Sequence, residues 1–171
     1  MSVVPPILAL AGAGVPSFVL ELFPSVNPLN ALLFSIVLFN TPHIMRVYFT
    51  SKATGSVSKF RNDNPRGQLD KLIGENKEYA GILSRCQAAH NNGLESFPVF
   101  AAGVLAALLL KVDPTYAGRI ATVHLISRVA FNVLYIFTSS RLPAACRSLC
   151  WFLSLLTSCQ LIATAGAKLS M

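Results

Sequence analysis

The sequence predicts an all-α protein, a transmembrane four-helix up-and-down bundle. Of its 171 residues, 53% are apolar and only 12% are charged, and the mean hydropathy is +0.57. A soluble domain usually has about 25% charged residues, and a disordered chain has fewer apolar ones. Crossing a bilayer takes about 20 largely apolar residues. Four stretches meet this requirement, over residues 28–49, 81–110, 115–138 and 145–167.

Short connections join the last three candidate spans. Pro114 follows Asp113 between the second and third spans, and Leu142-Pro143 separates the third from the fourth. Helices joined by so few residues run antiparallel. We therefore expect one membrane domain over residues 28–168, preceded by an N-terminal segment over residues 1–27.

The N-terminal segment is apolar from Val3 to Leu20 but is interrupted by prolines, and no cation precedes it. A secretory signal normally begins with a positive region, so cleavage is not expected. Two interpretations of residues 1–24 remain open. We favour a lumenal or interfacial segment, and the alternative is a fifth span.

The cations predict the orientation in the membrane. Lys and Arg concentrate in cytoplasmic loops, and here they occupy the long polar connection 50–80 and the short one 139–147. The opposite side has only Lys111 and Lys168. The connection 50–80 is therefore expected in the cytoplasm and both termini on the other side. This bias accounts for the net charge of +7. The sequence contains no basic recognition helix, so a nucleic-acid partner is not expected.

Polar side chains inside the second and third spans are the informative residues, because a charge in the bilayer costs about 2.5–3.5 kcal/mol on insertion scales. At about 100° per residue, Arg85, Asn92 and Glu95 share one side of the second helix. His90 points to the other side. On the third helix, Arg128 and Tyr135 belong to one stripe, seven residues apart, which also includes His124. Asn91, Arg119 and Asn132 complete the polar set.

A pair between Glu95 and Arg128 is expected, because the antiparallel arrangement brings both to the cytoplasmic half of the bilayer. Such a pair could simply hold the bundle together. Alternatively, it lines a polar pocket that opens toward the cytoplasm and binds a zwitterionic or anionic ligand beside an apolar wall. Arg46, at the cytoplasmic end of the first span, could reach this pocket, but snorkelling to the interface is the expected role.

No metal site is expected. His43, His90 and His124 do not have the spacing of a helical ligand pair, and His90 points away from the Arg85 side. The four cysteines form no CxxC motif and lie in apolar helical surroundings, which favours packing over a zinc site or disulfides.

The second span carries a familiar motif. Residues 85–100, RCQAAHNNGLESFPVF, resemble the core signature of the MAPEG family, the membrane-associated proteins in eicosanoid and glutathione metabolism. Arg128 followed by Tyr135 resembles the matching part of the family's third helix. Arg147 followed by Trp151 resembles the start of the fourth helix in its less characterised members. The resemblance covers residues 28–168.

The resemblance implies a homotrimer in the endoplasmic reticulum or another intracellular membrane, with glutathione as co-substrate at subunit interfaces that face the cytoplasm. Carried over by position, Asn92 and Glu95 contact glutathione, Arg85 lies at the entrance, and Tyr135 lines the site. Arg128 or Arg141 stabilises the thiolate, which a nearby guanidinium favours because a free thiol has a pKa near 8.5. The implied second substrate is a small lipophilic molecule.

Several positions depart from the pattern of the well-studied enzymes, because Ala88, Ser96, Phe131 and Leu142 stand where polar donors are often found. Two functions therefore remain. The favoured one is a glutathione transferase or peroxidase that acts on lipophilic electrophiles or lipid hydroperoxides. The alternative is a non-catalytic lipid-binding or scaffold member. A small transporter is less favoured, since its charges would have to reach both faces.

Overall fold

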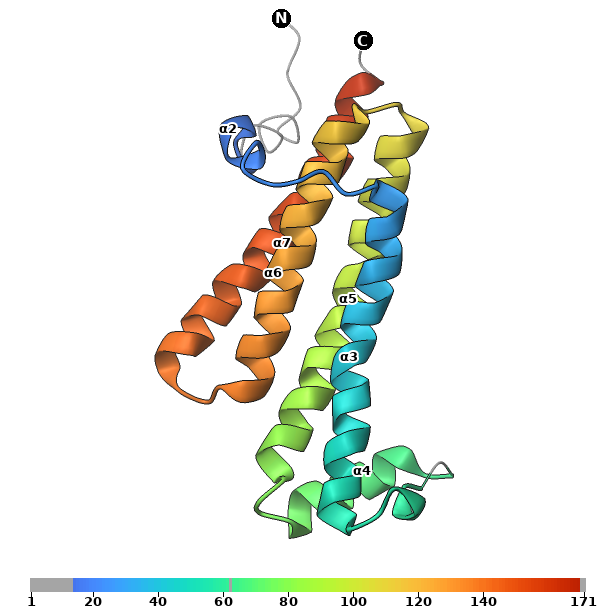
Figure 1. Cartoon of the computed structure of the whole chain (residues 1–171), viewed down its shortest axis with the longest axis vertical. Coiled ribbons are helices and arrows are strands. Elements are labelled where there is room, and N and C mark those ends of the chain that lie inside the picture. The colour runs from blue at the N-terminus through green and yellow to red at the C-terminus, as the bar shows by residue number, and fades with distance from the viewer. Residues whose placement is uncertain (1–13, 62, 170–171) are drawn as a thin grey trace, which may run out of the picture.

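The computed structural model describes residues 14–61 and 63–169, and within them it contains helices and no strand (Figure 1). Four helices are long and apolar enough to cross a membrane, which confirms the predicted all-α fold class. They are α3 (Pro28–Thr54), α5 (Ala80–Leu109), α6 (Pro114–Phe137) and α7 (Arg141–Lys168). The shorter elements are α2 (Ser17–Leu20), η1 (Val57–Lys59) and α4 (Pro65–Glu75).

Three helices begin with the same local signal, an Asn or Asp followed by Pro. The side-chain oxygen of the capping residue accepts a hydrogen bond from a backbone N–H of the first turn, which has no partner inside the helix. Proline suits the next position because its fixed φ is already helical and its missing N–H is not needed there. The three pairs are Asn27-Pro28 in α3, Asn64-Pro65 in α4 and Asp113-Pro114 in α6.

The last connection differs from the sequence-based expectation. Leu142-Pro143 does not lie between two helices but in the first turn of α7, which begins at Arg141. The N–H groups of a helix's first turn have no acceptor inside the helix, so Pro143 removes no hydrogen bond there. Residues 138–140 therefore form the connection between α6 and α7.

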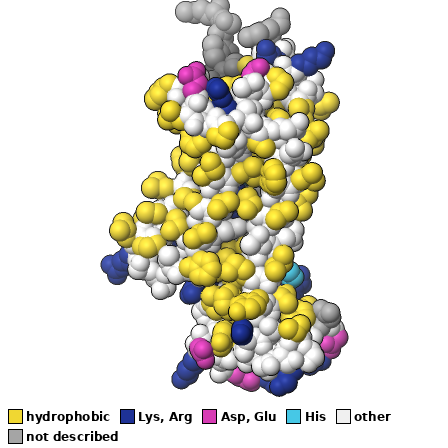
Figure 2. Space-filling model, viewed as in Figure 1, with side chains coloured by type: hydrophobic (Ala, Val, Ile, Leu, Met, Phe, Trp, Pro, Cys, Tyr) yellow, Lys and Arg dark blue, Asp and Glu magenta, His cyan; other side chains and the backbone are white. Residues whose placement is uncertain are grey.

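Neighbouring helices alternate in direction, and α2 and the last turns of α7 lie at the same end of the bundle (Figure 1). α3 packs on α5, α5 on α7, and α6 on α7. Phe100, Ile120 and Leu161 are fully buried in the main core. On the face shown in Figure 2, hydrophobic side chains cover the helical body, whereas acidic side chains lie only near its two ends. This pattern is typical of helices surrounded by lipid.

The described part of the N-terminal segment lies across the end of the bundle rather than through the membrane. Its helix α2 has four residues, far too few to span. The Gln160 side chain donates to the Val15 carbonyl (3.0 Å) and accepts from the Val15 N–H (2.9 Å), and Thr122 donates to the Pro24 carbonyl (2.7 Å). Residues 1–13, on which the fifth-span alternative also depends, lie outside the described residues.

Pro42 interrupts the hydrogen-bond ladder in the middle of α3. Because proline has no N–H, the carbonyl four residues earlier, that of Leu38, loses its helical donor. Asn132 of α6 donates its Nδ2–H to this carbonyl at 2.9 Å. His90 of α5 contacts the adjacent Phe39 carbonyl at 2.7 Å. Two polar side chains from neighbouring helices therefore stabilise the proline break, as backbone groups in a bilayer require.

Candidate functional site

Arg128 is the central polar residue of the interface between α5 and α6. Its side chain is buried, with 5% of its surface exposed, and its Nη1–H donates to Asn92 Oδ1 at 2.8 Å. The guanidinium lies over the Phe131 ring, 4.5 Å from its centroid. Asn92 and Phe131 thus fix the position of Arg128 without neutralising it, because both partners are uncharged.

Tyr135 and two further arginines continue this polar region toward the end of α6. The Tyr135 ring lies 5.3 Å from that of Phe131, and the guanidinium of Arg147 in α7 lies over it at 4.2 Å. Arg85 of α5 donates its Nε–H to the Ile136 carbonyl at 2.8 Å. This carbonyl belongs to the last turn of α6, where carbonyl groups have no N–H partner inside the helix. Cations are favourable at this end of a helix because of its dipole. We call Arg85, Asn92, Arg128, Tyr135 and Arg147 the α5–α6 site.

Glu95 and Arg141 do not join this site in the single chain. The predicted pair between Glu95 and Arg128 is wrong, because Glu95 is exposed and Arg128 bonds to Asn92 instead. Glu95 lies about 60° around the helix from Asn92, so its carboxylate points past the α6 interface. Arg141 is exposed at the first residue of α7. Among residues 14–61 and 63–169, the ion pairs are Arg61–Asp63 and Lys71–Glu75.

A second polar region lies on the other side of α5, facing α3 and α4. It is a cavity of 220 Å³. Arg46 is buried there, with 7% of its surface exposed, and it donates to Gln87 Oε1 and to His43 Nδ1, the latter at 3.1 Å. The expectation that Arg46 snorkels to the interface is therefore wrong. The lining residues are His43, Arg46, Pro65, Arg66, Gln87, His90, Asn91 and Leu94, and we call this the α3–α5 cavity.

The hydrogen bonds of the α3–α5 cavity define the state of its two imidazoles. Arg46 has only donors, so His43 Nδ1 accepts and carries no proton. The Phe39 carbonyl has only lone pairs, so His90 Nδ1 carries a proton and donates. The two rings lie 5.3 Å apart. The cavity therefore presents two guanidinium groups, those of Arg46 and Arg66, without a lining carboxylate.

An exposed strip of α5 separates the α5–α6 site from the α3–α5 cavity. Glu95 lies on this strip, about 60° from Asn92 on one side and about 80° from Gln87 on the other. Asn91, which accepts from Gln87 Nε2 at 2.6 Å, is exposed beside it. A carboxylate and an amide thus face outward from a membrane-spanning helix, between two cationic regions of the same chain.

The sequence reasoning missed the contributions of Gln87 and Arg66. Gln87 lies about 200° from Arg85 around α5, outside the polar side that the spacing identified. Its role becomes apparent only when α3 is known to pack against that side of α5. Arg66 reaches the cavity because α4 folds back against α5, and no pattern within residues 50–80 shows this. In the part of the chain that the structure describes, no three potential ligands among His, Cys, Asp and Glu come together around a metal position.

Four apolar helices with buried arginines between them define an integral, multi-pass membrane protein with a polar interior near one end. The MAPEG family model matches residues 29–167, which is most of the chain. The protein therefore belongs to the MAPEG family, as the motif in α5 predicted. No curated protein and no solved structure matches the chain.

Proposed function

We propose that the protein is a membrane-embedded, glutathione-dependent transferase or peroxidase that acts on lipophilic electrophiles or lipid hydroperoxides. One observation carries this proposal. Arg128 is buried in the stretch that matches the family and bonds to the neutral Asn92 rather than to a carboxylate. A buried guanidinium that keeps its full charge strongly favours an anionic partner such as a thiolate.

The charged groups of glutathione match those of the α5–α6 site, the α3–α5 cavity and the exposed strip. The molecule carries two carboxylates, one ammonium group and a thiol. Arg46 and Arg66 in the α3–α5 cavity and Arg128 and Arg147 in the α5–α6 site supply cations for the carboxylates and the thiolate. Glu95 on the exposed strip supplies a carboxylate for the ammonium group. The lipophilic second substrate would approach through the apolar lipid-facing surface of the same helices.

A homotrimer explains the exposure of these groups. The α3–α5 cavity has 220 Å³, which is below the roughly 300–1,000 Å³ of usual ligand sites. Glu95 is exposed on a spanning helix, where contact with lipid is unfavourable. If a neighbouring subunit packs against the exposed strip, it both covers Glu95 and brings the α5–α6 site of one subunit toward the α3–α5 cavity of the next.

Glutathione would supply the nucleophilic sulfur. Its thiolate bonds to an electrophilic carbon and displaces a leaving group such as chloride, or it attacks the outer oxygen of a hydroperoxide, which breaks the O–O bond and releases the lipid alcohol. The glutathione sulfenic acid formed in the second case reacts with another glutathione to give the disulfide and water. Arg128 would favour loss of the thiol proton, because its positive charge stabilises the thiolate. Asn92 keeps the Arg128 guanidinium in position through its hydrogen bond. Phe131, which is buried, shields this interaction from water and so strengthens it.

Glutathione titration into the detergent-purified protein tests the proposal, with Arg128→Ala and Arg119→Ala as a matched pair on α6. Arg119 is half-buried near the opposite end of that helix. We expect millimolar or tighter binding that Arg128→Ala weakens at least about tenfold, because a charged hydrogen bond contributes about 1.5–3 kcal/mol. Arg119→Ala should leave the affinity within about twofold. Absence of binding at millimolar glutathione, or equal losses in both variants, contradicts the proposal.

A second candidate function is non-catalytic lipid binding or scaffolding within the same family. It is favoured by the apolar residues at Ala88 and Phe131, the latter lying against Arg128 itself. Turnover of a lipophilic chloronitrobenzene with glutathione separates the two functions. If glutathione binds without turnover of either this compound or a lipid hydroperoxide, the scaffold function is the correct one.

A further inference from the structure

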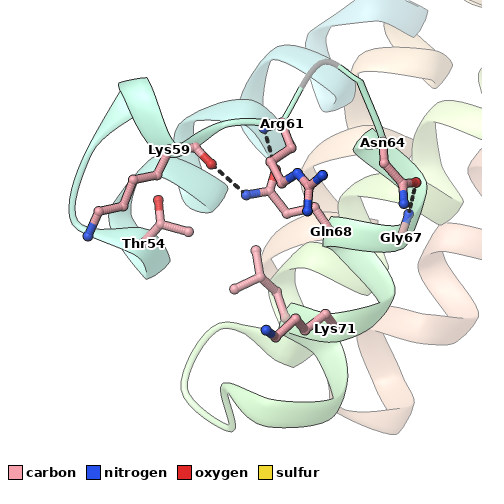
Figure 3. A pocket seen from close by; sticks show the side chains of 8 residues that line it. Thr54, Lys59, Arg61, Asn64, Gly67, Gln68 and Lys71 are labelled. Carbon is pink, nitrogen blue, oxygen red and sulfur yellow. Dashed lines mark hydrogen bonds between the residues drawn. The ribbon is translucent and has the colours of Figure 1, made fainter.

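A cavity of 330 Å³ lies outside the spanning helices, where the end of α3 meets η1 and α4 (Figure 3). Three of its lining residues are cations, Lys59, Arg61 and Lys71, and none is an acid. The others supply hydrogen-bonding groups or close the cavity. They are Thr54, Asn64, Gly67, Gln68 and Leu72. We call it the loop cavity.

Hydrogen bonds hold the two walls of the loop cavity together. Gln68 of α4 accepts from the Arg61 N–H at 2.8 Å and donates to the Lys59 carbonyl at 2.7 Å. Asn64 caps α4 by accepting from the Gly67 N–H at 3.0 Å. These bonds are drawn in Figure 3. These bonds connect the backbone at Lys59 and Arg61 to α4, the helix that carries Lys71. The backbone positions of the three cations are therefore fixed relative to one another.

The charges of the loop cavity match a dianion. Asp63 offsets Arg61, to which it lies at 2.6 Å, and hydrogen bonding to Arg61 holds the pKa of this carboxyl below its ordinary value. Lys71 has only a loose contact with Glu75, at 4.0 Å between two exposed side chains. Lys59 takes part in none of the described ion pairs. Two positive charges remain, and a phosphate monoester carries about −1.5 to −2 at neutral pH.

The length of α3 would place the loop cavity at the depth of lipid headgroups. α3 has 27 residues, which span about 40 Å, whereas the hydrocarbon core is about 30 Å thick. If α3 enters the core near Pro28, its last turns at Thr54 extend about 10 Å beyond the far boundary. This is the side that the cations predict to be cytoplasmic, where anionic lipids attract basic segments.

We propose that the loop cavity binds a phosphate monoester group, presented by an anionic phospholipid headgroup or by a soluble phosphate ester. Lys59 and Lys71 bind the phosphate oxygens from opposite walls. The size is adequate, because the cavity exceeds the lower limit of about 300 Å³ for ligand sites. The loop cavity is distinct from the α3–α5 cavity, since the two share no lining residue.

Two double variants with equal loss of charge test the site in the full chain. Lys59→Gln with Lys71→Gln removes two cations from the loop cavity, and Lys52→Gln with Lys77→Gln removes two from the same segment outside it. All four lysines are exposed, so both proteins should keep the wild-type helical circular dichroism. The ligands are dioctanoyl phosphatidate, dioctanoyl phosphatidylcholine and glycerol 3-phosphate, titrated calorimetrically into the protein in neutral maltoside micelles.

We expect saturable phosphatidate binding that the Lys59/Lys71 variant weakens at least about tenfold and the Lys52/Lys77 variant at most about threefold. General attraction to a basic surface would instead weaken binding about equally in both variants, and that result would overturn the proposal. Equal binding of phosphatidylcholine would also overturn it. Phosphatidate binding well above that of glycerol 3-phosphate supports a lipid as the source, and equal binding of the two supports a soluble phosphate ester.

Discussion

Arg128 and Arg46 lie in different helices, yet both donate to a side-chain amide oxygen, of Asn92 and Gln87 respectively. An amide fixes the direction of a guanidinium without cancelling its charge. A carboxylate in the same place would have formed a buried ion pair, which leaves little charge for a ligand. Because their partners are amides, both buried arginines keep the charge that the proposed anionic ligand requires.

Asn132 gives a test at the level of a single hydrogen bond. Asn132→Ala removes the donor to the Leu38 carbonyl, and an unsatisfied buried carbonyl costs about 1–3 kcal/mol. Pro42→Ala restores the N–H that this carbonyl lacks. We therefore expect Asn132→Ala to lower the thermal unfolding midpoint clearly in the Pro42 protein and only slightly in the Pro42→Ala protein.

Thermal unfolding of the four proteins in one detergent completes this double-mutant cycle. Asn132 Oδ1 is itself buried without a partner, but its removal affects both backgrounds equally and cancels. An identical cost of Asn132→Ala in both backgrounds would show that the Leu38 carbonyl is not what Asn132 stabilises.

Close helix approach depends on glycines that the hydrophobic pattern does not identify. A Cβ on Gly93 of α5 would lie 2.5 Å from Phe39 Cβ and 3.1 Å from its Cα in α3. A Cβ on Gly103 would lie 2.9 Å from the Ser158 carbonyl oxygen in α7. α5 thus contacts α3 and α7 backbone to backbone, as small residues permit in membrane helices.

Gly93→Ala tests the contact between α3 and α5, with Gly166→Ala as the matched control in α7. The first change forces the two helices apart and should destabilise the fold by about 1–3 kcal/mol. The second meets nothing within 4 Å and should be neutral or stabilising by up to about 1 kcal/mol, because alanine is the better helix former. Unfolding in detergent measures both, and a loss of equal size in the two variants would contradict the contact.

The sequence predicted the helices better than it predicted their partners. Apolar length was enough to place both ends of the four spanning helices to within about five residues. Side-chain spacing placed Asn92 and Glu95 on the same side of α5. A rotation of α5 by about 60° about its axis decides which of the two bonds to Arg128. Spacing on one helix does not determine this rotation, because it depends on packing against two other helices. Arg46 was misjudged for the same reason, since its burial depends on α4 and α5.

At the scale of the whole molecule, polar groups are distributed unequally between the two ends. The end at which α7 finishes is closed by the segment from Val15 to Asn27, which is held by Gln160 and Thr122. Gly118 of α6 leaves room for this segment, since a Cβ there would lie 2.3 Å from the Val26 carbonyl oxygen. The α5–α6 site and both polar cavities lie toward the other end. Ligands that come from water should therefore enter from the side of α4.

The orientation itself is testable with Cys146, which is exposed near the start of α7. We expect a membrane-impermeant maleimide to label it in sealed microsomes, whose outer surface is the cytoplasmic one. The control is Leu169→Cys in a Cys146→Ser background, because Leu169 is exposed at the opposite end. That cysteine should react only after permeabilisation. The reverse pattern of labelling would place α4 on the lumenal side.

The proline break in α3 also constrains how the protein is made. α3 leaves the ribosome before the helix that carries Asn132, so during synthesis the Leu38 carbonyl has no hydrogen-bond donor from another helix. In α3 alone in lipid, this carbonyl would be exposed to hydrocarbon, which cannot solvate it. We therefore expect a nascent chain truncated before Asn132 to stay bound to the insertion machinery longer than one that includes α6.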